Sequence, residues 1–136
     1  MTVRPPSGAP PPAAVEFDGR RVDLVALAVE VCRRYLEAYP DEHGRYGDAG
    51  ADWCRHDNQW LLCWAIDDVL GVTDLREQAL WLARVLHARE FPLSRLAHNL
   101  RIAAGVAAEG SFGEASEAVS VRLAAAADAV AGLHPS

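Results

Sequence analysis

The sequence predicts an all-α domain of about five main helices. Apolar residues recur three or four positions apart through most of the chain, which is the period of a helix with one buried face. Glycine and proline interrupt this pattern at intervals that suit connections between helices. Nothing alternates with a period of two for long enough to predict a strand. A chain of 136 residues is also long enough to bury one core.

A tail is expected before this domain. Residues 1–15 hold five prolines among serine, glycine and alanine. Such a composition has few backbone donors and little apolar bulk, so it favours an extended or disordered state. We therefore expect residues 1–17 to be a disordered proline-rich tail and residues 18–136 to form the helical domain.

Local signals bound the five predicted helices. Asp74 with Glu77, and Ser111 with Glu114, have the spacing of a capping box at a helix start. Pro92 suits a first helical position. Three glycines within residues 40–51 predict a loop. The predicted helices are residues 22–39, residues 52–70, a third from 74, a fourth from 92, and a fifth from 111 to about 133.

Charge and composition limit the classes of partner. The formal net charge is −6, every basic residue is an arginine, and the arginines are scattered, which argues against a nucleic-acid partner. No segment approaches the roughly 20 apolar residues of a membrane-spanning helix, and no secretory signal is visible. Three cysteines do not read as a disulfide framework. We expect a cytoplasmic protein with no membrane partner.

The predicted helix over residues 52–70 differs chemically from the others. At 100° per residue, three of the four tryptophans share one face with a cysteine and two aspartates, and we expect this face to be turned toward the core. A carboxylate there is costly unless something pairs with it. Three interpretations of Asp57 stay open: its carboxylate accepts hydrogen bonds within the structure, reaches water at the margin of the face, or faces a bound ligand. Asp68 is expected to be solvated. The face comprises Trp53, Cys54, Asp57, Trp60, Leu61, Trp64, Ala65, Asp68 and Val69.

Cys54 has two interpretations. Cys54 and Asp57 are three residues apart, so their side chains leave the helix side by side. Cys54 is either a small buried hydrophobic residue or a reactive thiol beside a ligand that Asp57 binds. Cys63 projects to the opposite side of the helix, so it cannot pair with Cys54 within this element.

This segment resembles the chromophore-bearing helix of the phycobiliproteins. That family's pattern has a cysteine, an aspartate three residues later, and aromatic residues six and ten positions past the cysteine. Downstream, a glycine follows the helix and a proline-containing turn leads into the next one. In this chain the matching features are Tyr46-Gly47, Cys54-Arg55-His56-Asp57, Trp60-Leu61-Leu62-Cys63-Trp64, Gly71 and Phe91-Pro92-Leu93.

The resemblance covers roughly residues 35–108 and implies a globin-like (phycobiliprotein-like) fold that binds a linear tetrapyrrole, a bilin. Cys54 matches the cysteine that forms a thioether to ring A, and Asp57 matches the carboxylate that bridges the N–H groups of the two central pyrroles. Trp60, Leu61 and Trp64 would line the site. His56 stands where the family usually has an arginine for a propionate, with Arg55 one step earlier.

The chain departs from the family at its N-terminus, where the proline-rich tail replaces the helical extension that builds heterodimers. The resemblance therefore implies a divergent relative outside light harvesting. The expected function is a non-enzymatic, sensory or regulatory bilin-binding protein.

Two alternatives stay open. A haem-binding globin would use His87, near the end of the third predicted helix, as its iron ligand. A ligand-free module would fill its pocket with tryptophan side chains and act as a homodimer.

An enzyme is not expected. The sequence lacks a nucleophile–histidine–acid set that can be placed together, a glycine-rich phosphate loop, and the close spacing of a zinc site. Asp57 and Asp68 are separated by about 16 Å along the helix axis, too far for a catalytic carboxylate pair.

Overall fold

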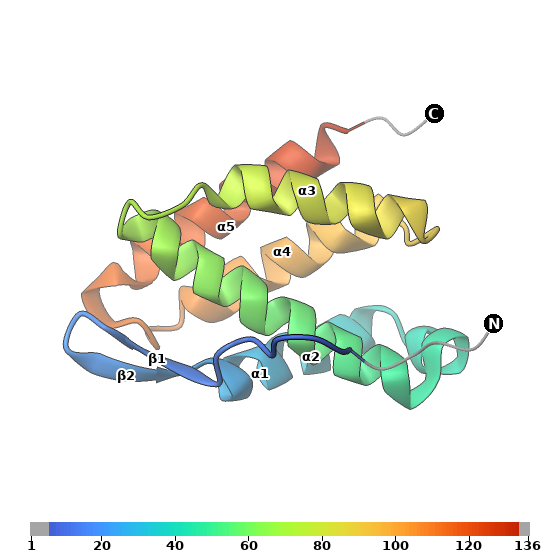
Figure 1. Cartoon of the computed structure of the whole chain (residues 1–136), viewed down its shortest axis with the longest axis horizontal. Coiled ribbons are helices and arrows are strands. Elements are labelled where there is room, and N and C mark those ends of the chain that lie inside the picture. The colour runs from blue at the N-terminus through green and yellow to red at the C-terminus, as the bar shows by residue number, and fades with distance from the viewer. Residues whose placement is uncertain (1–5, 134–136) are drawn as a thin grey trace. The chain divides into compact units, whose positions relative to one another are not determined.

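The computed structural model describes residues 6–133 and is mostly helical, as the sequence predicts. The described residues form a two-stranded antiparallel sheet, five α-helices and one short 3-10 helix (Figure 1). In chain order the elements are β1 (Ala14–Phe17), β2 (Arg20–Asp23), α1 (Leu24–Ala38), α2 (Glu42–Val69), α3 (Leu75–Ala88), α4 (Leu93–Ala107), η1 (Gly113–Ala115) and α5 (Ser116–Ala131).

The β1–β2 hairpin contradicts the expectation that the chain holds no strand. Phe17 pairs with Arg20, so the connecting loop is the two-residue sequence Asp18-Gly19. Both residues have positive φ, 53° and 76°, as tight hairpin turns require. Strand β1 lies within residues 1–17, so the predicted tail extends too far. Ala13 continues this ordered segment, since its carbonyl accepts from the N–H groups of Leu24 and Val25.

The described chain divides into two compact units, where the sequence analysis expected one helical domain. The N-terminal unit ends at Cys63 and the C-terminal unit begins at Trp64. The boundary falls within α2, so the first part of this helix belongs to one unit and its last turns belong to the other.

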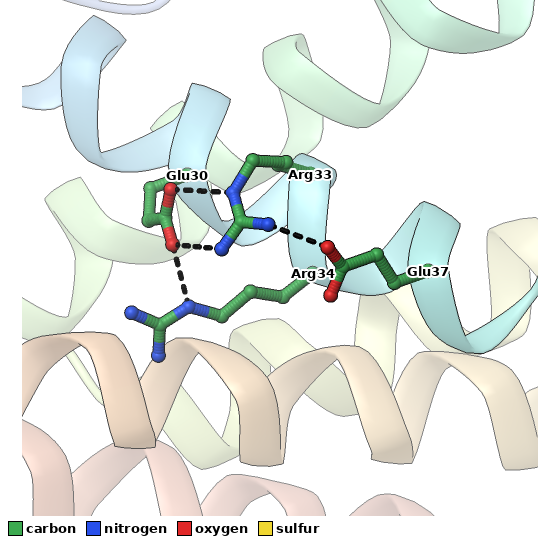
Figure 2. A network of polar contacts seen from close by, with 4 residues as sticks. All are labelled: Glu30, Arg33, Arg34 and Glu37. Carbon is green, nitrogen blue, oxygen red and sulfur yellow. Dashed lines mark hydrogen bonds and ion pairs between the residues drawn. The ribbon is translucent and has the colours of Figure 1, made fainter.

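In the N-terminal unit, α1 begins two residues later than predicted because Val22 is part of β2. The side chain of Asp23 caps the helix by accepting from the N–H of Ala26 at 3.0 Å. Apolar side chains at helical spacing form its buried side. Its outer side carries an ion-pair network of Glu30, Arg33, Arg34 and Glu37 (Figure 2). The buried residues of α1 are Leu24, Ala28, Val31, Cys32 and Tyr35.

Helix α2 occupies much of the predicted loop over residues 40–51. Glu42 lies in its first turn and is buried, and its carboxylate accepts from the Tyr35 hydroxyl at 2.8 Å. Gly47 interrupts the helix, with φ 65° and ψ −160°. Gly50 stands against Tyr46, where a Cβ would clash. Gly47 therefore allows a kink within the helix and Gly50 allows a close contact with Tyr46, and the segment is not an open loop.

In the C-terminal unit, α5 packs against both α3 and α4. Their buried faces are rich in alanine, which allows helix backbones to approach closely. The predicted cap of α3 is confirmed: Asp74 accepts from the N–H of Glu77 at 3.3 Å. The predicted capping box at Ser111 is wrong, because α5 starts at Ser116, whose hydroxyl accepts from the N–H of Phe112 at 3.1 Å.

Within residues 6–133, each helix is too short or too polar to cross a lipid bilayer.

Candidate functional site

The buried side of α2 is aliphatic and polar, not aromatic. Leu61, Leu62, Ala65 and Ile66 are buried, together with the amides Asn58 and Gln59. Trp53, Trp60 and Trp64 are each only partly buried. The predicted core-facing side is therefore wrong for the three tryptophans, whereas Leu61 and Ala65 of the same predicted face are buried. The buried aliphatic residues follow Trp60 and Trp64 by one or two positions in the sequence, so they project in a different direction from the helix. They are buried, and the tryptophan rings lie at the edge of the buried side.

Trp53, His56 and Asp57 form a cluster on α2 within the N-terminal unit. The Nδ1 atom of His56 lies 3.0 Å from an Oδ1 carboxylate oxygen of Asp57. The Trp53 ring meets the His56 ring edge to face, with 5.2 Å between centroids and an angle of 77°. The side chains of His56 and Asp57 are 19% and 23% exposed, so both are largely desolvated yet reachable. We call these three residues the α2 cluster.

Cys54 lies beside this cluster in sequence, but its sulfur belongs to a different contact. The Nδ2 atom of Asn58 lies 3.5 Å from Cys54 Sγ and 3.6 Å from the Sγ of Cys32 on α1. The same amide donates to the Cys54 carbonyl at 3.0 Å. A hydrogen bond with Cys32, followed by burial, raises the pKa of the Cys54 thiol above its ordinary value. Cys54 is therefore protonated at neutral pH.

The other predicted site residues differ in burial and in the unit to which they belong. Arg55 is exposed and Leu61 is 1% exposed within the core. Trp60 belongs to the N-terminal unit and Trp64 to the C-terminal unit. Of the predicted binding residues, the structure brings together His56 and Asp57, and it adds Trp53 to them.

Asp68 was expected to be more solvated than Asp57, but both side chains are 23% exposed, and Asp68 accepts hydrogen bonds from two donors. One carboxylate oxygen accepts from Arg122 Nε on α5 at 2.7 Å, and the other accepts from the N–H of Leu75 at the start of α3 at 2.8 Å. Asp68 thus has a structural role within the C-terminal unit.

The histidines other than His56 are less suited to a buried site. His87 is exposed in the last turn of α3, and His43 in the first turn of α2 and His98 on α4 are exposed as well. His134 lies outside the described residues. Over the described range 6–133, no three His, Cys, Asp or Glu side chains come together as a metal-ion site would require.

Cys32 and Asn58 were not among the predicted site residues. Asn58 lies four residues after Cys54, a spacing that places two side chains together on a helix. Cys32 follows Val31 in the apolar stripe of α1, which marks it as buried. Nothing in the sequence indicates that one amide contacts both thiols, because that contact joins two helices.

Comparison of the chain with protein-family models, with curated proteins and with solved structures gives no significant match.

Proposed function

We propose that this protein is a non-enzymatic helical module that binds a linear tetrapyrrole non-covalently at the α2 cluster and serves a sensory or regulatory role. The single observation that carries the proposal is the partly buried pair of His56 and Asp57, held at 3.0 Å beside the Trp53 ring.

The chemistry of a bilin suits these groups. A protonated bilin is a cation that presents several parallel N–H donors, and a largely desolvated carboxylate such as Asp57 stabilises it through charge-assisted hydrogen bonds. The His56 imidazole offers a ring N–H donor to a propionate. The Trp53 ring offers an apolar, π-rich surface for a conjugated system.

Cys54 supports non-covalent rather than thioether-linked binding. Thioether formation needs a thiolate that reaches the chromophore, and the thiolate is the nucleophilic form of cysteine. Here the sulfur contacts Asn58, and its raised pKa keeps it protonated. In this proposal Cys54 is a core cysteine beside the binding face.

The proposal retains a globin-like relationship for the helical part of the chain. Its support is the spacing of the landmarks from Tyr46 to Phe91-Pro92-Leu93, together with the five helices of the described residues. A sensory role follows from this reading because the residues of the α2 cluster can hold a chromophore without transforming it.

The proposal is tested by producing the protein in cells that make both haem and a bilin. We expect a visible absorbance band that copurifies with the folded protein and no zinc-enhanced bilin fluorescence on a denaturing gel. Fluorescence on the gel would instead indicate a covalent link. A Soret band alone would move the assignment to haem, and a colourless protein would contradict the proposal.

The ligand-free homodimeric module is the second candidate, and one observation favours it. Trp81 on α3 is 53% exposed, and Leu70 and Val72 in the preceding turn are 57% and 73% exposed. Large exposed apolar side chains are typical of interaction surfaces when they are contiguous. Analytical ultracentrifugation of the wild type and of Trp81→Glu distinguishes this candidate: a dimer that the substitution dissociates would support it.

A further inference from the structure

We propose that Cys32 and Cys54 are a redox modification site at which a reversible disulfide joins α1 to α2. This inference goes beyond the proposed function, since it concerns the inner side of α2 and not the ligand face. It depends on the juxtaposition of two thiols around one amide.

Asn58 brings the two sulfur atoms together. Its side chain is 1% exposed, and its Nδ2 atom lies within 3.6 Å of both Sγ atoms while also donating to the Cys54 carbonyl. The amide is therefore fixed by a backbone acceptor, and both sulfurs converge on it. Both cysteines belong to the N-terminal unit, so the pair lies within one compact body.

Cys63 is excluded as a disulfide partner of Cys54 by distance along the helix. It follows Cys54 by nine positions on α2, which corresponds to about 13 Å of helix axis. A disulfide requires Cα atoms within about 7 Å. Cys63 therefore serves as an internal control for nonspecific thiol oxidation.

The two thiols differ in solvent exposure, and this difference indicates which of them reacts first with an oxidant. Cys32 is 9% exposed, and Cys54 is the more exposed of the two. Cys54 is thus the thiol that meets an oxidant first, and Cys32 is the thiol that resolves the product.

The reaction with a low-molecular-weight disulfide proceeds in two exchanges. Because the raised pKa keeps the Cys54 thiol protonated at neutral pH, the first exchange requires alkaline solution. The Cys54 thiolate that forms there, after losing its proton to solvent, attacks the reagent disulfide and releases one reagent thiol. The Cys32 thiolate, after losing its proton, then attacks the Cys54 sulfur of the mixed disulfide and releases the second reagent thiol. The protein loses two protons and two electrons, which together equal two hydrogen atoms, and the reagent disulfide is reduced to two thiols.

The disulfide changes the N-terminal unit in a measurable way. It closes a loop that contains the α1–α2 connection and the kink at Gly47, and such cross-links reduce the freedom of the unfolded chain. The oxidised protein is therefore expected to melt at a higher temperature than the reduced one, by several degrees, and dithiothreitol is expected to reverse the shift.

The experiment uses the full chain, folded and fully reduced, incubated with oxidised glutathione and then alkylated. Intact mass should show a protein that has lost two hydrogen atoms and takes up one alkyl group, where the reduced protein with its three free cysteines takes up three. Peptide mapping should place the link between Cys32 and Cys54. In Cys63→Ser the same link should form, whereas Cys32→Ser should stop at a glutathione adduct on Cys54.

Three results would overturn the proposal: three alkylated cysteines after oxidation of the wild type, a link that maps to Cys63, or a link between two chains. Circular dichroism before and after oxidation confirms that the folded protein reacted. The mapping of the wild type decides the question even if Cys32→Ser does not fold. The mass measurement does not depend on bilin binding. A negative result for the disulfide therefore leaves the proposed function untouched, and a negative result for bilin binding leaves the disulfide proposal untouched.

Discussion

The carboxylate of Asp68 connects the end of α2 with two other helices of the C-terminal unit. It accepts from Arg122 Nε at 2.7 Å and from the N–H of Leu75 at 2.8 Å. The second contact satisfies a backbone donor in the first turn of α3 that has no partner within its own helix. The Asp68 side chain thus caps the start of α3 and also forms an ion pair with Arg122 on α5.

Replacing Asp68 with alanine is expected to lower the free energy of unfolding by about 2 kcal/mol, because hydrogen bonds to charged groups are stronger than neutral ones. Chemical denaturation measures the change. The matched control is Asp128→Ala, which removes an ion pair with Arg101 on the surface, where the side chains are 72% and 49% exposed. That variant should change stability by less than about 0.5 kcal/mol. Equal effects in the two variants would contradict a structural role for Asp68.

Asn58→Ala is expected to destabilise the N-terminal unit by about 2–3 kcal/mol. The substitution removes a buried amide that contacts the Cys54 carbonyl and two thiols, and it leaves a cavity. Thermal unfolding followed by circular dichroism measures the loss. Arg55→Ala, at an exposed position on the same helix, is the control and should be nearly neutral. An unchanged melting temperature for Asn58→Ala would show that the amide is not a structural link.

Glu30 on α1 is expected to titrate far below an ordinary glutamate. Hydrogen bonds from Arg33 and then Arg34 lower the pKa of its carboxyl group to about 2 (Figure 2). A lowered pKa in the folded state adds stability that is present above the unfolded pKa and is lost as pH falls toward 2. NMR of the carboxyl carbon gives the midpoint. Arg33→Gln should move it upward more than Arg34→Gln, and a wild-type midpoint near 4 would contradict the network.

The reactivity of Cys54 is expected to rise with pH through the whole neutral range. Its pKa is raised by the hydrogen bond with Cys32 and by burial, so the thiolate fraction, and with it the alkylation rate, should increase about tenfold per pH unit. The raised pKa also means that the stability it contributes is present below the unfolded thiol pKa of about 8.5 and falls above it. Mass spectrometry of iodoacetamide-treated protein resolves each cysteine. A rate for Cys54 that is already level at pH 8 would contradict the raised pKa.

The helices could be predicted from sequence because apolar spacing and caps are local signals. Asp74 caps α3 as predicted, and Leu123, Ala127 and Val130 form a buried stripe on α5. The hairpin was missed although Asp18-Gly19 is a strong turn signal, because its strands have only four residues each. The alternation of Val15 and Phe17 is too short to stand out from a helical pattern.

The candidate site could be predicted in part. The sequence placed His56 and Asp57 among the candidate binding residues because both lie in one short stretch of α2, but it did not predict that their side chains pair. The partner of Cys54 could not be predicted, since Cys32 lies on another helix. The prediction that the tryptophans are buried was also wrong. Leu61 and Leu62 are buried instead, and their positions on the helix determine which face points into the core.

Titration of the purified protein with biliverdin, followed by absorbance, tests the proposed function most directly. For the wild type we expect a saturable red shift and sharpening of the long-wavelength band, because Asp57 stabilises the protonated bilin. In Asp57→Asn the shift should be lost or the affinity should fall at least tenfold, while Asp48→Asn, at an exposed position on α2, should bind as the wild type does. An identical spectrum and affinity in wild type and Asp57→Asn, or no saturable change in either, would contradict a bilin site at the α2 cluster.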